Sequence, residues 1–372
     1  NGFAFKSAMF DKNIGFPILR IRDITSGEIS TFYKGDYSDD YIVQKGDLLI
    51  GMDGDFNIRW WDKENVLLNQ RCCRIIENEK SVKRFLYYSL PFNLQIINDL
   101  TYFTTVKHLS SGDINNAKFP LPSPQEQTQI ATYLDYKTGL IDAIIAQKED
   151  LIKKLKEQRQ AIINEAVTKG LNKDVKLKDS GIEWLGEIPE HWKVSKFKYF
   201  AKIRNGKDQK GVIVENGKYP ILGTGGEFGR ASEFLYDKPS VLLGRKGTID
   251  KPQFIEEPFW TVDTLFYTEI QENVSPKYLF FLSTLIPFNL LQESSAIPSM
   301  TQDKLHNVFL TKPSYVEQKN IVIHIENEMD KMDLLISKEK TSIQKLKEYR
   351  QSLISEAVTG KIDVRDWQAP KS

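Results

Sequence analysis

One long segment of this chain occurs twice. When residues 126–168 are written over residues 317–359, a shift of 191 positions without a gap, 17 of the 43 aligned residues are identical. Glu165-Ala166-Val167-Thr168 matches Glu356-Ala357-Val358-Thr359 at the end of the two copies. Identity of this density over an ungapped stretch indicates an internal duplication. The chain of 372 residues is therefore expected to fold as two related modules.

Each copy has the pattern of a long amphipathic helix. In the first copy Leu134, Ile141, Leu155 and Ile162 recur at heptad spacing, with Lys148 in the same series. A sustained heptad without proline predicts a rod of roughly 40 residues, about 60 Å long, that pairs with another helix. We expect the two rods to pair as an antiparallel coiled coil. Further apolar residues of the first rod are expected beside this seam: Ile130, Ile144, Ile145, Leu151, Ile152 and Ala166.

The ends of both rods carry helix-capping signals. Ser123 followed by Pro124 and Glu126 predicts a capping box with proline in the first turn. Ser314 and Glu317 repeat the spacing at the same shift of 191. Gly170 and Gly360 are placed where a helix of each copy should end.

The segments outside the rods have the texture of mixed α/β globular domains. Strand-like runs bounded by turns, such as residues 47–51 and 240–244, are accompanied by apolar helix-like runs at 82–90 and 276–286. Each domain leads into its rod through similar approaches, residues 105–110 and 296–301. The fold class is therefore α+β with a pseudo-two-fold internal repeat. The expected divisions are a first domain at 1–121, a first helix at 122–170, a connector at 171–183, a second domain at 184–312, a second helix at 313–361 and a tail at 362–372.

No catalytic or metal site is expected, and no cofactor. The four histidines, His108, His191, His306 and His324, lack metal-ligand spacing as a set. The glycine-rich stretch 221–229 reads as a turn because no helix pattern follows it, and Asp53, Asp55 and Asp62 read as loop residues. The adjacent Cys72 and Cys73 exclude a disulfide framework and favour the cytoplasm, and no stretch is apolar and long enough for a membrane span.

Basic residues mixed with aromatic ones are the one positive functional signal. Residues 192–210 are rich in lysine, only Asp208 is acidic, and Trp192, Phe197, Tyr199 and Phe200 lie among the cations. The pattern suits DNA contact, although a solvated charged face would give it too. Two similar domains on rigid rods favour a reader of two separated half-sites. The candidate DNA-binding residues are Arg20, Arg22, Arg59, Trp60, Lys107, Lys193, Lys196, Lys198, Lys202, Arg204, Lys207, Arg245, Lys246 and Thr248.

Several motifs resemble the specificity subunit of type I restriction–modification systems. The resemblance extends over essentially the whole chain, and five segments carry it: residues 45–57, 122–127, 159–168, 181–192 and 360–367. It implies two target-recognition domains that read a bipartite double-stranded DNA site. It also implies that the rods dock modification subunits, two in number, that restriction subunits complete the complex, and that this chain catalyses nothing.

Comparison of the two copies aligns Asn1-Gly2 with Asn205-Gly206. The first domain is therefore expected to lack an N-terminal segment of about 20 residues that the second domain has. Two other functions stay open at this level: an enzyme of the same pathway, such as a fused methyltransferase or nuclease, and a coiled-coil scaffold without a role at DNA.

Overall fold

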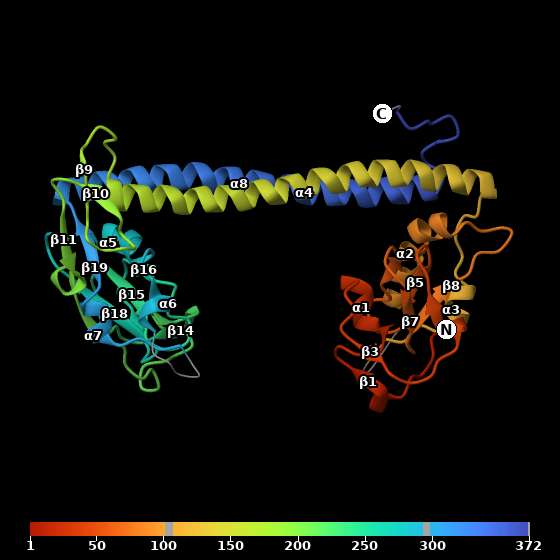
Figure 1. Cartoon of the computed structure of the whole chain (residues 1–372), viewed down its shortest axis with the longest axis horizontal. Coiled ribbons are helices and arrows are strands. Elements are labelled where there is room, and N and C mark those ends of the chain that lie inside the picture. Colours follow the sequence, from red (N-terminus) through yellow and green to blue (C-terminus); the bar gives the residue numbers. More distant parts are fainter. Residues whose placement is uncertain (101–106, 293–297, 371–372) are drawn as a thin grey trace. The chain divides into compact units, whose positions relative to one another are not determined.

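The computed structural model describes residues 1–100, 107–292 and 298–370, which form two compact units (Figure 1). The first unit contains residues 1–149 and 340–372, and the second contains residues 150–339. Both units share the two long helices, α4 (Pro124–Lys169) and α8 (Tyr315–Val358). Each unit thus combines one globular region with part of each helix. Residues 340–372 belong to the first unit because the chain returns to it along α8.

Two sheets form the globular region of the first unit. One has the order β1-β3-β2-β7-β4 and the other the order β6-β5-β8. Strands β2 and β7 pair in parallel, and β5 pairs antiparallel with both of its neighbours. The elements are η1 (Ser7–Met9), β1 (Phe10–Asp11), β2 (Phe16–Leu19), α1 (Ile21–Ser26), β3 (Phe32–Tyr33), η2 (Asp39–Tyr41), β4 (Ile42–Val43), β5 (Leu48–Gly51), β6 (Ile58–Trp60), β7 (Val66–Leu68), β8 (Cys72–Ile75), α2 (Lys83–Leu100) and α3 (Ser111–Asn115).

The second unit repeats this plan and adds strands at its start. Its larger sheet has the order β12-β18-β15-β16, while β14-β13-β17 contains a parallel pair, β13 with β17. Two further antiparallel pairs are β9 with β10 and β11 with β19. The elements are β9 (Leu177–Asp179), β10 (Glu187–Pro189), β11 (Lys193–Lys196), η3 (Phe197–Tyr199), β12 (Ala201–Asn205), β13 (Tyr219–Gly223), β14 (Gly226–Ala231), β15 (Ser240–Gly244), β16 (Gln253–Ile255), β17 (Trp260–Thr261), β18 (Leu265–Ile270), α5 (Pro276–Ser283), α6 (Phe288–Leu291), α7 (Gln302–His306) and β19 (Phe309–Lys312).

Gly2 and Gly206 occupy equivalent positions in the two units, as the sequence alignment of the copies predicted. A Cβ on Gly2 would lie 2.0 Å from the Asn69 carbonyl oxygen, and one on Gly206 would lie 2.0 Å from that of Val262. The Gly2 N–H donates to Cys72 O, and the Gly206 N–H donates to Leu265 O. Both positions require glycine because another backbone passes at contact distance.

The caps predicted for the rods are confirmed. The Ser123 N–H donates to Glu126 Oε2 and the Glu126 N–H donates to Ser123 Oγ, with the same exchange between Ser314 and Glu317. Helix α4 begins at Pro124 and ends at Lys169. Gly170 and Gly360 follow the helices with φ of 73° and 74°, the left-handed conformation that glycine adopts without strain.

The helices run antiparallel within each unit. In the first unit the Arg350 guanidinium donates to the Asp142 carboxylate at 2.9 and 3.2 Å. In the second unit Arg159 Nη1 donates to Asp333 Oδ1 at 3.1 Å. Both Arg159 and Asp142 have their counterparts, Arg350 and Asp333, at a shift of 191. The two ion pairs are therefore one pair repeated, which is what a pseudo-two-fold repeat produces.

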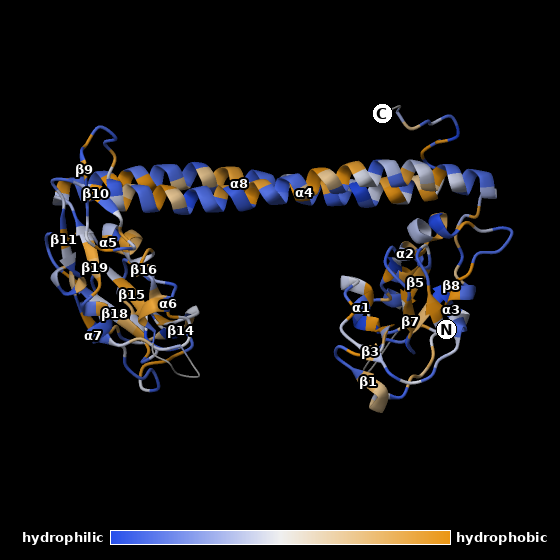
Figure 2. Cartoon of the chain, in the orientation of Figure 1, coloured by the Kyte–Doolittle hydropathy of each residue, from blue (hydrophilic) through white to orange (hydrophobic). Residues whose placement is uncertain are grey.

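Figure 2 shows the apolar residues of α4 and α8 as orange segments of the ribbon between blue ones. Leu134, Ile141, Ile145 and Ile152 of α4 are buried, in agreement with the heptad. Ile144 and Leu151, which we also expected beside the seam, are each 42% exposed instead. Both pairs, Ile144 with Leu151 and Ile145 with Ile152, fit the heptad spacing, but only the second pair is buried. Each exposed residue precedes a buried one by one position, which is about 100° around the helix and turns it away from the seam. Among the described helices none is long and apolar enough to cross a membrane.

Candidate nucleic-acid interface

In each unit the loop after one inner strand, β5 or β15, is held by the segment that precedes the rod. In the second unit β15 ends at Gly244, and the loop that follows contains the predicted residues Arg245, Lys246 and Thr248. Three backbone contacts, which we call the loop clasp, hold this loop. Lys246 and Ser299 form an isolated antiparallel β-bridge, the Gly247 N–H donates to Pro298 O at 2.9 Å, and the Met300 N–H donates to Arg245 O at 2.9 Å.

The first unit has the same loop clasp after β5. Asp53 and His108 form an isolated antiparallel β-bridge through their backbones, the Gly54 N–H donates to Lys107 O at 3.1 Å, and the Leu109 N–H donates to Met52 O at 2.7 Å. Residues 107–109 and 298–300 belong to the approaches that the sequence aligned; residues 105, 106, 296 and 297 lie outside the described ranges. One backbone framework thus presents two different sets of side chains.

The side chains of the first clasp form an ionic cluster that sequence reasoning missed. His108 Nδ1 lies 2.7 Å from Asp53 Oδ1, and Arg71 Nε lies 3.6 Å from Asp53 Oδ2. Arg71 comes from the turn between β7 and β8, and its side chain is 54% exposed. The three residues are up to 55 positions apart in the sequence, so no local motif could have revealed them.

Three of the predicted basic residues in the first unit donate hydrogen bonds to other residues of the chain. Lys107 Nζ donates to the backbone and side-chain oxygens of Asn98 at 2.6 Å. Arg59 Nη1 donates to Ile24 O and Thr25 O at 3.0 Å, where it fixes the end of α1. Arg22 donates to two hydroxyl groups, those of Ser30 and Thr31. Arg20 lies over the Phe10 ring at 5.9 Å, and Trp60 lies beneath the Arg84 guanidinium.

The predicted basic run of the second unit separates into engaged and free cations. Arg204 makes a bidentate pair with Glu269 at 3.0 Å, Lys196 donates to Asn307 Oδ1, and Lys198 lies over the Tyr199 ring. Among the candidate residues of the second unit, Lys193, Lys202, Lys207 and Lys246 have side chains that make no hydrogen bond, ion pair or ring contact with the described part of the chain. Thr248 is half-buried, and its carbonyl oxygen packs against Gly244.

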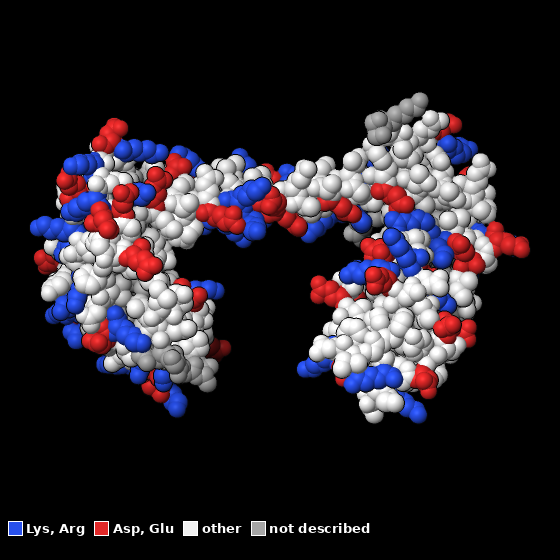
Figure 3. Space-filling model, in the orientation of Figure 1, with Lys and Arg blue, Asp and Glu red and all other residues white. Residues whose placement is uncertain are grey.

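Three of the four aromatic residues of that run are core residues, and the expected surface of alternating rings and cations is not formed. Trp192, Phe197 and Phe200 are 2%, 0% and 0% exposed, whereas Tyr199 is 57% exposed. The three buried rings belong to the same apolar cluster as Ile163, Ala166 and Val167 of α4, so burial against the rod decides their place. On the face drawn in Figure 3, positive and negative side chains are mixed over both units.

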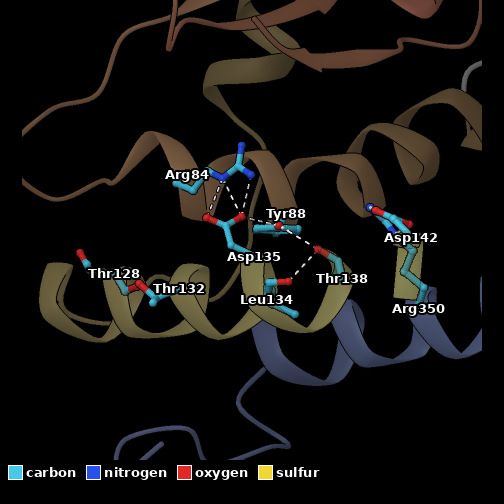
Figure 4. Close-up of polar contacts among 9 residues, drawn as sticks. All are labelled: Arg84, Tyr88, Thr128, Thr132, Leu134, Asp135, Thr138, Asp142 and Arg350. Atoms are coloured by element: carbon cyan, nitrogen blue, oxygen red, sulfur yellow. Dashed lines mark hydrogen bonds and ion pairs between the residues drawn. The ribbon is translucent and has the colours of Figure 1, made fainter. Parts of the chain in front are cut away.

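Each globular region is anchored to its rod by an ion pair. In the first unit Arg84 of α2 and Asp135 of α4 point toward each other, and Arg84 Nε donates to both carboxylate oxygens at 2.8 and 3.0 Å (Figure 4). The Tyr88 hydroxyl donates to Asp135 Oδ1 at 2.6 Å. Burial alone lowers the pKa of Arg84, but the Asp135 carboxylate raises it, and the pKa ends above its ordinary value. In the second unit Lys277 Nζ donates to Glu326 Oε1 at 2.6 Å.

A buried glutamine adds a second anchor in both units. Gln127, 0% exposed, accepts from the Val82 N–H and donates to Lys80 O and Pro122 O. Gln318, 1% exposed, accepts from the Ser275 N–H and donates to Pro313 O. A buried amide that satisfies backbone groups from the domain fixes how the domain sits on the helix.

The cysteines, the glycine-rich stretch and the acidic residues can now be placed in the structure. Burial raises the pKa of Cys72 to about 12 and that of Cys73 to about 11, so both thiols stay protonated. Strands β13 and β14 form a hairpin over the glycine-rich stretch, as its interpretation as a turn predicted. Within residues 1–100, 107–292 and 298–370, no three His, Cys, Asp or Glu side chains are grouped to hold a metal ion.

Comparison with known proteins decides the family. The sequence model of the type I restriction modification DNA specificity domain matches residues 1–154 and again residues 189–348. The chain belongs to this family. The EcoBI specificity subunit of Escherichia coli is 30% identical, with 99% of this chain and 85% of that protein aligned. The MjaVIII specificity subunit of Methanocaldococcus jannaschii is 26% identical over 94% of this chain and 87% of that protein.

Solved structures share the fold of this type I specificity chain. A chain from a study of the assembly and conformational transition of the type I restriction–modification system superposes with a TM-score of 0.73 at 16% identity, covering 94% of this chain and 93% of that one. The HsdS subunit of Thermoanaerobacter tengcongensis gives 0.53 at 16% identity, covering 94% and 92%. The relatives are specificity subunits, which are the non-catalytic DNA-recognition subunits of type I restriction systems.

Proposed function

We propose that each unit of this specificity subunit reads one half of a bipartite double-stranded DNA target. The observation that carries the proposal is the loop clasp, which occurs in both units with the same backbone contacts and different side chains. A duplicated framework with different side chains suits two readers of different sequences, because base edges are distinguished by donors and acceptors that side chains supply.

The free lysines of the second unit are proposed to contact the DNA backbone. Lys202 and Lys207 are exposed, whereas Arg204 between them is neutralised by Glu269. Replacing both lysines with alanine should reduce the slope of log affinity against log salt by about 0.9 for each phosphate that is no longer neutralised. Arg204→Ala is the matched control and should leave the slope unchanged. An unaltered slope in the double variant would mean that the lysines are only solvated.

The helices are proposed to dock modification subunits, one on each unit, and restriction subunits would then complete the nuclease. Ile144 in the first unit and Leu335 in the second are related by the shift of 191, and they are 42% and 46% exposed. Apolar side chains left open at equivalent positions suit two copies of one partner. Ile144→Glu and Leu335→Glu should each weaken binding of the modification subunit, while the polar exchange Gln147→Glu on the same helix should not.

A domain exchange tests half-site reading. Residues 193–312 run from β11 to its partner β19, and they are to be replaced by the equivalent residues of a relative with another target. The complex with modification subunits is then assayed by sequencing methylated sites. We expect a new sequence in one half of the target and the original sequence in the other. A change in both halves, or in neither, would refute independent reading.

A further inference from the structure

Arg71 has an unusual backbone conformation at the loop clasp of the first unit. Its φ is 70°, and Phe56 is the one other residue besides glycine with positive φ in the described ranges. Left-handed φ is strained for side chains with a Cβ, and such residues gather at functional sites. The Arg71 carbonyl accepts from the Met52 N–H at 2.8 Å, so the turn is bound directly to the loop after β5.

Asp53 lies beside the Arg71 guanidinium, and His108 orients Asp53. Because a carboxylate only accepts, the 2.7 Å contact places the His108 Nδ1 proton toward Asp53 Oδ1. Asp53 Oδ2 then faces Arg71 Nε at 3.6 Å. Arg71 Nη1 lies 3.3 Å from His108 Nδ1, but a protonated Nδ1 does not accept from it, so His108 acts on Arg71 by orienting Asp53. No other side-chain partner of Arg71 occurs among the described residues, so the far edge of its guanidinium keeps donors for a ligand.

In the second unit an arginine also lies where the loop meets the turn, but it belongs to the loop after β15 and not to the turn before β18. Thr264 takes the place of Arg71, since its carbonyl accepts from the Arg245 N–H at 2.8 Å. Arg245 stands where the first unit has Met52, and its Nη1 donates back to Asp263 O at 3.2 Å. Both units therefore place one guanidinium between the loop and the turn, although the sequences supply it from different positions.

We propose that Arg71 reads a guanine in the major groove of the first half-site, with Asp53 and His108 as the residues that position it. This inference rests on the proposed function. An arginine fork matches the two acceptors of guanine, O6 and N7. A phosphate contact is disfavoured because the Asp53 carboxylate lies beside the guanidinium and repels a second anion, whereas a base edge carries no net charge.

The test uses the chain assembled with its modification subunits and a duplex library randomised over both half-sites. Arg71→Gly removes the side chain and suits the left-handed backbone, so the variant should unfold at a temperature no lower than the parent. It should lose roughly tenfold or more of the preference for guanine at one position of the first half-site. The second half-site should be unchanged, and so should the slope against salt. Arg71→Lys keeps the charge and can still donate to O6 and N7, but it lacks the planar fork and should retain only part of the preference.

Two results would overturn the assignment: an unchanged preference at every position of the first half-site, or a uniform loss of affinity with a shallower salt slope, which would mark a phosphate contact. His108→Ala tests positioning and should reduce the same guanine preference less than Arg71→Gly does. An effect of His108→Ala on other positions alone would contradict its role. If the parent complex, without any substitution, selects no bipartite site, the proposed function fails as well. That result is distinct from a failure confined to Arg71, in which the parent complex still selects its site.

Discussion

Removing the Asp135 carboxylate should loosen the first globular region from its rod. Asp135 accepts from Arg84 Nε at 2.8 and 3.0 Å and from the Tyr88 hydroxyl at 2.6 Å. Tyr88 is 4% exposed, and Asp135→Ala leaves its hydroxyl with Thr138 at 3.2 Å as its remaining partner. We estimate about 1 kcal/mol for the half-exposed ion pair and about 1–2 kcal/mol for the buried hydroxyl, roughly 2–3 kcal/mol in total.

Asp142→Ala is the matched control. Asp142 also receives two hydrogen bonds from an arginine, Arg350, but its side chain is 53% exposed and no buried group depends on it. An exposed pair of this kind contributes about 0.5 kcal/mol. The comparison therefore isolates the contribution of the buried hydroxyl and of the contact between domain and helix.

The readout is hydrogen exchange measured by mass spectrometry. It reports the opening of α2 alone, whereas global unfolding of a protein with two units need not be a two-state process. Asp135→Ala should accelerate exchange of the α2 amides by about 30-fold to 150-fold, since 1.4 kcal/mol corresponds to about tenfold. Peptides from α5 in the second unit should be unaffected. Asp135→Asn retains an acceptor for Tyr88 and should lie between the parent and Asp135→Ala. Equal acceleration by Asp135→Ala and Asp142→Ala would refute this account of the anchor.

Three further predictions follow from the anchors and the repeat. Hydrogen bonds from His191, Ser314 and Trp192 outweigh the effect of burial and lower the pKa of Glu317 to about 2, so the stability that ionised Glu317 contributes is present above about pH 4.5 and is lost as the pH falls toward 2. The difference in melting temperature between the parent and Glu317→Gln should therefore shrink over that window, and a constant difference would contradict it. Gln127→Leu should destabilise the first unit by about 3 kcal/mol in denaturant titration, because it leaves the Val82 N–H and two carbonyl groups without their partner; a loss below about 1 kcal/mol would show that water replaces the amide. Gly206→Ala should cost about 2 kcal/mol or more because its Cβ would meet the Val262 carbonyl oxygen, whereas Gly225→Ala, with open space around it, should be neutral in the same thermal assay.

The rods and the duplication could be predicted from the sequence because their signals are local and periodic. A heptad is visible within one segment, and Ser123 and Glu126 form their capping box three positions apart. The strand-like run at 240–244 is β15, and the helix-like run that begins at residue 276 is α5. Ile144 and Leu151 mark the limit of this reasoning, since apolar character alone did not tell which side of α4 faces its neighbour.

The candidate interface was decided only by tertiary structure. Composition marked the basic run at 192–210, but the partners that remove Arg204 and Lys196 from it, Glu269 and Asn307, lie 65 and 111 positions away. The same holds for Asp53 and His108, 55 positions apart, which meet because the loop after β5 is clasped by the segment before the rod. Sequence determines which groups a chain can offer through residue type and local period. Whether a cation is neutralised, buried or left free depends on long-range contacts, because its electrostatic energy is set by the few ångströms around it.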